Sequence, residues 1–501
     1  MPSMFATRRH RYGAPRRPPA AARPARLPGG GRFRAPLPAA QFKALNGQRV
    51  TVIGAGFAGL TAACFLREAG FGVTVLEARS DVGGRGSSRT DICPGRIIEA
   101  GAELIGANHP MWLSFANRLG LGLSVLTSED EFTAASLAMP LHLNGALLSP
   151  AEADDVYTQM DQVLTQISKD AATIDDPYRP WLSPNAQAWD AISVAQRLPD
   201  FGVEAGSLLW SAIAAELGNN QVVPIEEQSY LGLTAVVRGG QLAGDINAFW
   251  TQSEVFRCAE GNQQLAYALR ELLEVVSPGS VLTGVPVTAV TITPDQVTVT
   301  ADGTDYTSDY AVLAIPQPTW AAISFSPAIP PGYQIATGPA VKYLSPLDNR
   351  FWLPEGLAPC SLSDGLGMTW EGTDNQMLIP GQGLELSVFA GGPWAAQARQ
   401  AADKQQYFTD NLTPMYPDYA GYATPAGTFI DWPSEQWTGC GYSCAAPGQV
   451  TTAAPLLAEL YQQRLAFAGE HTVMAMFGYM EGALESGYIA AIRILAAASQ
   501  P

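Results

Sequence analysis

Three glycines near the start of the ordered-looking sequence have the spacing that phosphate binding requires. Gly54, Gly56 and Gly59 form a Gly-x-Gly-x-x-Gly pattern, and Glu77 lies 18 residues beyond the last of them. In this pattern the first glycine makes a tight turn, the second lets the backbone approach a pyrophosphate, and the third allows a helix to pack closely on a strand. An acid at this spacing accepts a hydrogen bond from a ribose hydroxyl. The residues predict a dinucleotide-binding site without separating NAD from FAD.

The segments around these glycines have the pattern of a strand–helix–strand unit. Residues 50–56 are an apolar, β-branched run that predicts a buried parallel strand. Residues 58–70 predict a helix that Gly70 closes, and residues 73–78 predict a second strand. This unit places the glycine turn at the carboxyl end of a strand, as a Rossmann-like α/β domain does.

Further elements are predicted along the rest of the chain. Ser149 is followed by Pro, Ala and Glu, a sequence that caps the start of a helix, and residues 150–250 are predominantly helical in pattern. Asp302-Gly303 predicts a hairpin turn between short strands. The remaining predicted elements are a helix at 264–275, strands at 281–292, 296–301 and 309–315, and a final helix at 480–498.

Several segments resemble the flavin amine oxidase superfamily. Residues 77–85 (EARSDVGGR) resemble its extended nucleotide fingerprint, and residues 468–472 (AGEHT) with 478–487 (GYMEGALESG) resemble its closing FAD motif about 400 residues later. Residues 340–343 (AVKY) and 432–442 (WPSEQWTGCGY) are similar to internal landmarks of monoamine oxidases. The chain thus resembles a bacterial-type, monoamine oxidase-like member of a superfamily that also contains the L-amino-acid oxidases.

The resemblance implies a particular architecture. We expect an α/β fold with a Rossmann-like FAD-binding domain of the two-dinucleotide-binding-domain type and an inserted α+β substrate-binding domain. The discontinuous FAD-binding domain is expected at residues 48–105, 251–320 and 455–498, and the substrate-binding domain at residues 106–250 and 321–454. The active site should lie at their junction.

The resemblance also implies roles for individual residues toward FAD. Glu77 is expected to hold the adenosine ribose, the backbone of Val287 to meet adenine, and Glu470 to bind the ribityl–pyrophosphate part. Arg79 and Arg85 should lie beside the cofactor, although Arg85 and Glu470 could instead form a purely structural pair. The full expected set is Gly54, Gly56, Ala58, Gly59, Glu77, Ala78, Arg79, Gly84, Arg85, Val287, Gly469, Glu470, Tyr479 and Met480.

Three residues match catalytic positions of the family. Tyr442 and Tyr479 match the two aromatic residues that flank the substrate amine, where two rings exclude water and orient the nitrogen. Lys342 matches the lysine that holds a water near flavin N5.

Animal monoamine oxidases attach FAD through a cysteine just before the position of Tyr442, where this chain has Gly441, so we expect non-covalent FAD. Cys440 and the later Cys444 could form a disulfide or remain buried thiols.

The expected reaction is oxidation of an amine C–N bond by hydride transfer to flavin, with O2 as acceptor. The closest alternative is an L-amino-acid oxidase or dehydrogenase, which needs a cation for the substrate carboxylate. In the familiar enzymes this arginine falls in the stretch matching residues 101–106, which here has none, although Arg89, Arg238, Arg257 or Lys342 could replace it. A desaturase or porphyrinogen-type oxidase fits the paired tyrosines less well, and a flavin-binding scaffold without turnover is the alternative outside enzymes.

Composition bounds the remaining possibilities. The chain has 501 residues and a formal charge of −17. Residues 1–49 hold 11 Lys and Arg and no acid, which leaves 18 basic and 46 acidic side chains, a balance of −28, in the rest. A body this acidic repels nucleic acid and attracts cations, so we expect no nucleic-acid partner and a small amine as substrate, for which a cationic amine would suit the charge. Residues 1–47, rich in Arg, Pro and Ala, predict a disordered basic tail.

Other features of the composition argue against further partners. Four His and six Cys without repeated paired spacing predict neither a metal centre nor a disulfide scaffold. The sequence has no run of about 18 apolar residues, so we expect no stable membrane anchor and a cytoplasmic protein. A homodimer is an expectation from the family alone.

Overall fold

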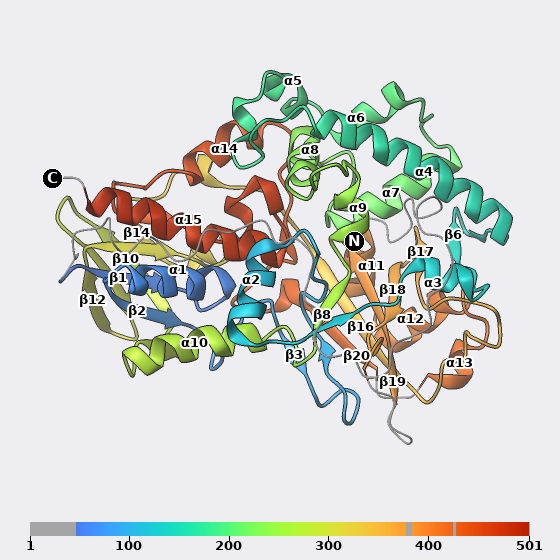
Figure 1. Ribbon diagram of the computed structural model, residues 1–501, viewed down its shortest axis with the longest axis horizontal. Coiled ribbons are helices and arrows are strands. Elements are labelled where there is room, and N and C mark those ends of the chain that lie inside the picture. Colours follow the sequence, from blue (N-terminus) through green and yellow to red (C-terminus); the bar gives the residue numbers. More distant parts are fainter. Residues whose placement is uncertain (1–46, 377–382, 424–426, 500–501) are drawn as a thin grey trace.

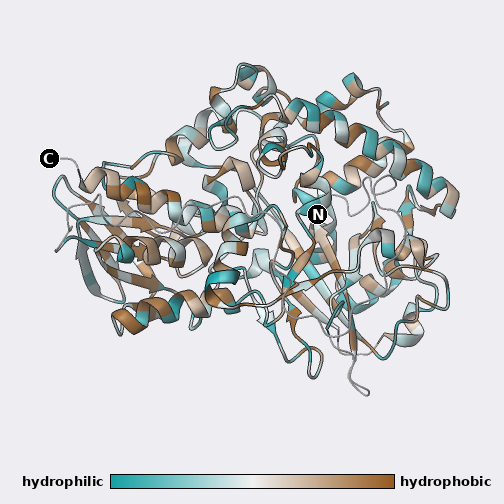
Figure 2. Cartoon of the chain, viewed as in Figure 1, coloured by the Kyte–Doolittle hydropathy of each residue, from teal (hydrophilic) through white to brown (hydrophobic). Residues whose placement is uncertain are grey.

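The structure is a computed structural model that describes residues 47–376, 383–423 and 427–499. The predicted basic tail, residues 1–47, lies outside the described residues except for Gly47. Figure 1 shows two parts side by side, with the final helix α15 (Met480–Ala498) in the same part as the first strand β1 (Arg49–Ile53). Strands and inward-facing helix surfaces in both parts are largely apolar (Figure 2).

The first part is built on a five-stranded parallel sheet in the order β22-β13-β1-β2-β9. Besides β1, its strands are β2 (Gly72–Glu77), β9 (Val281–Thr283), β13 (Tyr310–Leu313) and β22 (Leu465–Phe467). The inner strands are rich in Val, Ile and Leu and are buried on both faces, as a parallel sheet requires. Sequence segments from both ends of the chain therefore meet in one sheet.

Helices cover this sheet closely. Helix α1 (Phe57–Glu68) packs against α10 (Gln264–Val276) and α15. A side chain at Gly487 of α15 would place its Cβ 2.2 Å from the carbonyl oxygen of Ala58, so the two helix backbones can touch only because this residue is glycine. The contact holds α15, at its eighth residue, against the first turns of α1.

A four-stranded sheet in the order β12-β11-β10-β14 lies beside the parallel sheet. Its strands are β10 (Val287–Ile292), β11 (Val297–Ala301), β12 (Thr304–Ser308) and β14 (Ser324–Ser326). Asp302 and Gly303 form the predicted hairpin turn, both with positive φ.

The second part contains a seven-stranded sheet in the order β20-β16-β19-β18-β17-β6-β7. Its strands are β20 (Thr428–Asp431), β16 (Ala340–Leu347), β19 (Leu384–Gly391), β18 (Gly367–Glu371), β17 (Ser361–Ser363), β6 (Leu141–Leu143) and β7 (Ala146–Leu147). Helices from residues 150–252 pack beside it, among them α4 (Pro150–Ala171), α7 (Leu208–Asn220) and α8 (Tyr230–Gly239).

Shorter elements complete the described chain. The further helices are α2 (Pro110–Leu119), α3 (Glu129–Ala134), α5 (Ala186–Asp190), α6 (Val194–Arg197), α9 (Ala248–Gln252), α11 (Gly392–Gln400), α12 (Lys404–Leu412), α13 (Tyr419–Tyr422) and α14 (Gln449–Leu457). The further strands are β3 (Ser88–Arg89), β4 (Ile98–Glu99), β5 (Leu123–Val125), β8 (Phe256–Cys258), β15 (Thr337–Gly338) and β21 (Tyr442–Ser443). None of the helices in the described ranges is long and apolar enough to cross a membrane.

The α/β fold predicted from the sequence is confirmed, with one correction in the strands. The segment 281–292 is two strands, β9 and β10, which belong to different sheets. Gly284 has a φ of +72° and Pro286 lacks an N–H, so the chain leaves one sheet and enters the next at this point. The final helix has the predicted bounds, and the division into two discontinuous domains stays a prediction.

Candidate active site

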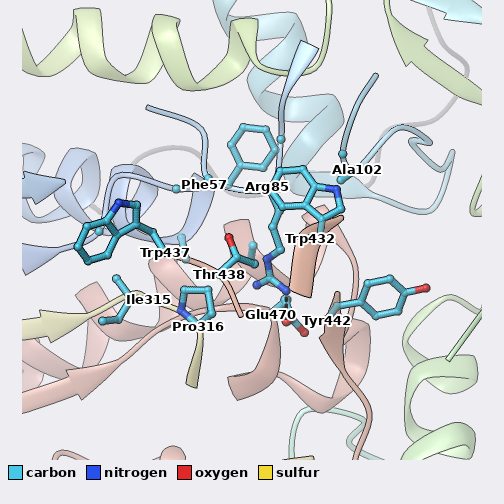
Figure 3. A pocket seen from close by; sticks show the side chains of 18 of the residues that line it. Phe57, Arg85, Ala102, Ile315, Pro316, Trp432, Trp437, Thr438, Tyr442 and Glu470 are labelled. Atoms are coloured by element: carbon cyan, nitrogen blue, oxygen red, sulfur yellow. Dashed lines mark hydrogen bonds and ion pairs between the residues drawn. The ribbon is translucent and has the colours of Figure 1, made fainter. Parts of the chain in front are cut away.

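One large cavity of about 870 Å³ lies between the two parts. Its walls include the carboxyl ends of the parallel strands, at Ile53 and Leu76, and one face of the seven-stranded sheet, at Lys342 and Phe389. Crevices at the carboxyl ends of parallel strands are where α/β proteins bind ligands. In Figure 3, which looks into this cavity, Trp437 and Tyr442 lie on opposite sides of Arg85.

The structure brings nearly all of the predicted site residues to this cavity. Those that line it are Gly54, Gly56, Ala58, Glu77, Ala78, Arg79, Gly84, Arg85, Val287, Lys342, Tyr442, Gly469, Glu470, Tyr479 and Met480. Gly59 is the exception, because it lies beneath the wall. A Cβ at Gly59 would be 1.9 Å from the carbonyl oxygen of Gly54, so this glycine holds α1 against the strand end.

The turn after β1 is shaped to receive a phosphate-bearing ligand. Gly54 has a φ of +101°, which a side chain would strain. A Cβ at Gly56 would meet no protein atom within 4 Å, so the space beside this residue belongs to the cavity. The N–H groups of the first turn of α1 follow directly, without an acidic side chain in that turn. Free N–H groups and a helix N-terminus favour an anion here.

Glu77 ends β2 at the same edge of the sheet. Its two carboxylate oxygens accept hydrogen bonds from the backbone N–H groups of Ala55, at 2.7 Å, and Arg79, at 2.8 Å. Burial raises the pKa of Glu77, and these hydrogen bonds oppose that effect. The carboxylate therefore locks the glycine turn to the next strand while facing the cavity. This part of the wall fits a dinucleotide.

Arg85 and Glu470 form an ion pair on the cavity wall, with 2.9 Å between guanidinium nitrogen and carboxylate oxygen (Figure 3). Arg85 also donates to the carbonyl of Gly441, and Glu470 accepts from the N–H of Gly478 at 2.8 Å. Burial acts to raise the pKa of Glu470, but the positive charge of Arg85 and the hydrogen bonds from Ser443 and Gly478 together lower it. The pair joins the loop before Tyr442 to the loop before Tyr479.

Tyr442 and Tyr479 are brought together by these loops. A Cβ at Gly478 would lie 3.1 Å from a ring carbon of Tyr442, so the Tyr442 ring lies against the residue that precedes Tyr479. The Tyr442 hydroxyl donates to the carbonyl of Asn220 at 2.7 Å, at the C-terminal end of α7. Burial, with the negative charge of Glu254 next, raises the pKa of both tyrosines well above the ordinary value. Both rings therefore stay uncharged.

Lys342 is held by an acid that the sequence did not single out. Its ammonium lies 2.6 Å from a carboxylate oxygen of Glu103 and donates to the carbonyl of Glu99 at 2.9 Å. The other oxygen of Glu103 lies 2.7 Å from Arg257 and accepts from the indole N–H of Trp370 at 2.8 Å. All members of this group are buried.

Glu103 stays ionised within this group. Burial acts to raise its pKa, but Lys342 and Arg257 outweigh burial and lower it. The sequence shows that the stretch 101–106 lacks arginine. It does not show that Glu103, the acid in this stretch, pairs with Lys342. Only the folded sheets bring residues 103, 257 and 342 together.

Other predicted features have simple outcomes. Cys440 and Cys444 are buried thiols without a disulfide, which decides between the two alternatives left open by the sequence. Burial raises the pKa of the Cys440 thiol to about 11, so this thiol is not activated. No group of three or more His, Cys, Asp or Glu among the described residues could hold a metal ion.

The glycine turn at a parallel sheet and the acid at the end of β2 fit a dinucleotide-binding protein, and its cavity continues to a pair of tyrosines. The chain belongs to the flavin-containing amine oxidoreductase family, whose model matches residues 57–495. The protein is thus a flavin-dependent enzyme acting on amines.

Relatives within the family span several substrates. The chain is 24% identical over 465 residues to an L-amino acid dehydrogenase of a Synechocystis strain, covering 89% of this chain and 94% of the relative. It is 24% identical over 468 residues to the flavin-containing amine oxidase B of Homo sapiens, covering 89% and 86%.

Solved structures show the same fold. A putrescine oxidase bound to putrescine matches with a TM-score of 0.77 at 21% identity, covering 90% of this chain and 99% of that one. The cyclohexylamine oxidase of Brevibacterium oxydans IH-35A matches with a TM-score of 0.75 at 21% identity and the same coverage.

Proposed function

We propose that this flavin amine oxidoreductase binds FAD non-covalently, oxidises a small amine that has no carboxylate beside its nitrogen, and uses O2 as acceptor. The observation that supports the choice of substrate is that each Lys or Arg on the cavity wall has an acidic partner. The pairs are Arg79 with Glu435, Arg85 with Glu470, and Lys342 with Glu103. The remaining basic side chain there is His471, and burial lowers its pKa to about 4. Among the described residues of this wall, a substrate carboxylate would find no unpaired cation.

The cofactor assignment rests on the shape and donors of the wall. The open space beside Gly56, the first turn of α1 and the carboxylate of Glu77 suit the pyrophosphate and ribose of a dinucleotide. When bound, FAD would supply the acceptor for a hydride from the carbon next to the amine nitrogen. The proposal of non-covalent binding is supported by Gly441 before Tyr442 and by the buried, protonated thiol of Cys440.

The paired tyrosines would position the substrate nitrogen. Two uncharged rings on one wall exclude water and favour the neutral amine, whose lone pair is needed when the hydride leaves the neighbouring carbon. The balanced reaction converts an amine, O2 and water into a carbonyl compound, ammonia or a smaller amine, and H2O2. In this proposal Lys342, tied to Glu103, holds a water at the cavity wall.

A second candidate is oxidation of L-amino acids, which the Synechocystis relative favours. The four cations that could bind the substrate carboxylate are engaged elsewhere. Arg89 pairs with Asp91 on the surface, and Arg238 donates to the carbonyl of Ile174. Neither lines the cavity. Arg257 and Lys342 both hold Glu103. We therefore favour amines over amino acids.

An anaerobic bleaching screen tests the proposal. Purified protein is mixed without oxygen with pairs that differ only by the carboxylate, such as phenethylamine and L-phenylalanine or cadaverine and L-lysine. We expect faster bleaching of the flavin absorbance by the amines and rapid recolouring on admission of air, with H2O2 formed. Preferential bleaching by amino acids would contradict the substrate proposal, and slow recolouring would indicate a dehydrogenase.

Two finer points need separate measurements. Acid precipitation should release the flavin into solution as FAD, whereas flavin retained on the protein would contradict non-covalent binding. The homodimer and the cytoplasmic location remain predictions, which size-exclusion chromatography with light scattering and cell fractionation would test.

A further inference from the structure

We infer that Glu103 is a specificity-determining residue of this site, because it occupies the ammonium of Lys342, the one lysine that the described residues place on the cavity wall. The inference rests on the proposed amine oxidase function. It names a residue of this chain that favours amines over amino acids as substrates, and it predicts which substitutions would reverse this preference.

The geometry gives Lys342 this position. Lys342 lies on β16 and lines the same cavity as Tyr442 and Tyr479. The two arginines on the wall are held by acids of other loops, Arg79 by Glu435 and Arg85 by Glu470, and Arg85 also donates to the carbonyl of Gly441. Lys342 instead faces Trp370, with its ammonium 5.2 Å from the ring centre. In this inference a carboxylate on the substrate would meet this ammonium.

The carboxylate of Glu103 forms an ion pair with that ammonium. It is 6% exposed and divides its two oxygens between Lys342 and Arg257, at 2.6 and 2.7 Å. Trp370 donates a third hydrogen bond to the carboxylate. Bringing in a second carboxylate would require its desolvation next to an anion without an available cation, which is unfavourable in a buried site. An amine without a carboxylate avoids this cost.

The other charged groups around this cluster leave Glu103 as its anion. Burial raises the pKa of Glu99 to about 7 and of Glu385 to about 8, so both are largely protonated in slightly acidic solution. The negative charge of Glu103 is one of the causes that raise the pKa of Glu385. With Glu103 in place, these two acids therefore add little negative charge at pH 6.5, and loss of Glu103 would lower the pKa of both, because its charge is one of the causes that raise them.

The test uses charge-matched double variants. Glu103→Gln alone leaves two buried cations unpaired and threatens folding. E103Q/R257Q removes one acid and one base, so Lys342 remains as the unpaired cation on the cavity wall. E103Q/K342M also removes one acid and one base but leaves Arg257, which does not line the cavity. The two variants have the same formal charge and differ in where the free cation lies.

We expect E103Q/R257Q to gain amino-acid recognition. At pH 6.5 its ratio of kcat/KM for L-phenylalanine to that for phenethylamine should rise about 10- to 100-fold above wild type, the range of one charge-assisted hydrogen bond. A ratio within one variant cancels any loss of rate common to both substrates. E103Q/K342M should keep the wild-type ratio or lower it.

A binding measurement gives an answer that does not depend on turnover. Phenylacetate carries the carboxylate and no amine, and its Kd is measured by perturbation of the flavin spectrum. E103Q/R257Q should bind phenylacetate at least tenfold more tightly than wild type and than E103Q/K342M. Equal affinity in all three proteins, or a gain in E103Q/K342M as well, would overturn the inference.

The outcome separates this inference from the proposed function. If wild-type protein bleaches faster with L-phenylalanine than with phenethylamine, the proposed function fails. If it prefers the amine and E103Q/R257Q shows no shift in the ratio or in phenylacetate affinity, the proposed function stands and the role of Glu103 fails.

Discussion

Gly56 and Gly59 lie three residues apart, and each needs the absence of a side chain for a different reason. A Cβ at Gly59 collides with the carbonyl of Gly54 at 1.9 Å, whereas a Cβ at Gly56 meets only cavity. Gly59→Ala should destabilise the protein by about 1–3 kcal/mol, as overpacking does. Gly56→Ala should leave stability within about 0.5 kcal/mol of wild type but lower flavin content. Urea unfolding of the flavin-free protein and the flavin-to-protein absorbance ratio measure the two effects.

A third glycine provides the control. Gly421, in the short helix α13, has open space around its Cβ position and lies far along the chain from the turn. Gly421→Ala should change neither stability nor flavin content. If Gly56→Ala retained full flavin, the space beside this residue would not be where the cofactor's phosphates lie.

The Tyr442 hydroxyl and ring can be separated in the same way. Tyr442→Phe removes the hydrogen bond to the carbonyl of Asn220 and keeps the ring, so kcat/KM should fall about fivefold, the worth of one buried hydrogen bond. Tyr442→Ala removes the ring and should cost much more. Because the pKa of Tyr442 lies well above its ordinary value, the pH dependence of kcat/KM between pH 6 and 9 should be the same in Tyr442→Phe as in wild type. A lost pH limb in this variant would show that the hydroxyl titrates.

Residues of the candidate site fall into two groups by how far the sequence could predict them. Gly54, Glu77 and Tyr479 sit in short motifs, where neighbouring residues carry enough information to place them. Glu103 and Asn220 carry no such local pattern. Their positions depend on the pairing of distant elements, which a single sequence does not specify. The contacts that hold Lys342 therefore become visible only in the folded chain.

At the scale of elements, the start of α15 is fixed by an acid in its first turn. Glu481 is fully buried, and its two oxygens accept from the backbone N–H groups of Met111, at 2.6 Å, and Trp112, at 2.9 Å. These are N–H groups at the start of α2, which have no partner within their own helix. Glu481 thus ties α2 to the helix whose first residues line the cavity.

Loss of this acid should therefore act on two helices at once. Glu481→Ala leaves two buried N–H groups unsatisfied and should destabilise the protein by about 2–4 kcal/mol. Glu481→Gln keeps one acceptor oxygen and should cost roughly half as much. Urea unfolding compares both with wild type. Equal stability of Glu481→Ala and wild type would mean that water replaces the carboxylate between the helices.

Elements also differ in how well the sequence predicts them. The first strand–helix–strand unit and α15 follow from hydrophobic period and glycine positions, which are local signals. The seven-stranded sheet lacked such a signal. All eight residues of β16 are buried, including Lys342, so the strand shows no alternation of polar and apolar side chains. In the same sheet β17 pairs with β6, which lies about 200 residues earlier in the chain, and local patterns do not reveal such pairing.

For the whole molecule, buried titratable groups should set the pH range of stability. Burial lowers the pKa of His109 to about 3 and of His471 to about 4, so both stay neutral in the fold. The unfolded chain takes up protons at these side chains below about pH 6.5, and their contribution is lost as the pH falls toward 3–4. Burial raises the pKa of Glu99 and Glu385, so the fold keeps protons that the unfolded chain releases above about pH 4.5. Their contribution is lost as the pH rises to 7–8.

Burial also raises the pKa of Glu254 and Glu485 to about 7 and that of Glu481 well above its ordinary value. The raised acids outnumber the two histidines, so the free energy of unfolding should fall as the pH rises above about 4.5. Above pH 6.5 the carboxyls act alone, and each costs about 1.4 kcal/mol per pH unit until its folded pKa is reached. Glu385→Gln cannot ionise, so its stability should fall about 2 kcal/mol less than that of wild type between pH 6.5 and 8. Urea unfolding at half-unit intervals of pH measures both curves.

A wild-type curve that is flat from pH 6 to 8.5, or one parallel to that of Glu385→Gln, would show that Glu385 is already ionised in the fold. In that case the cluster around Lys342 would contain a second anion, and the charge-matched variants at Glu103 would have to be repeated in the Glu385→Gln background.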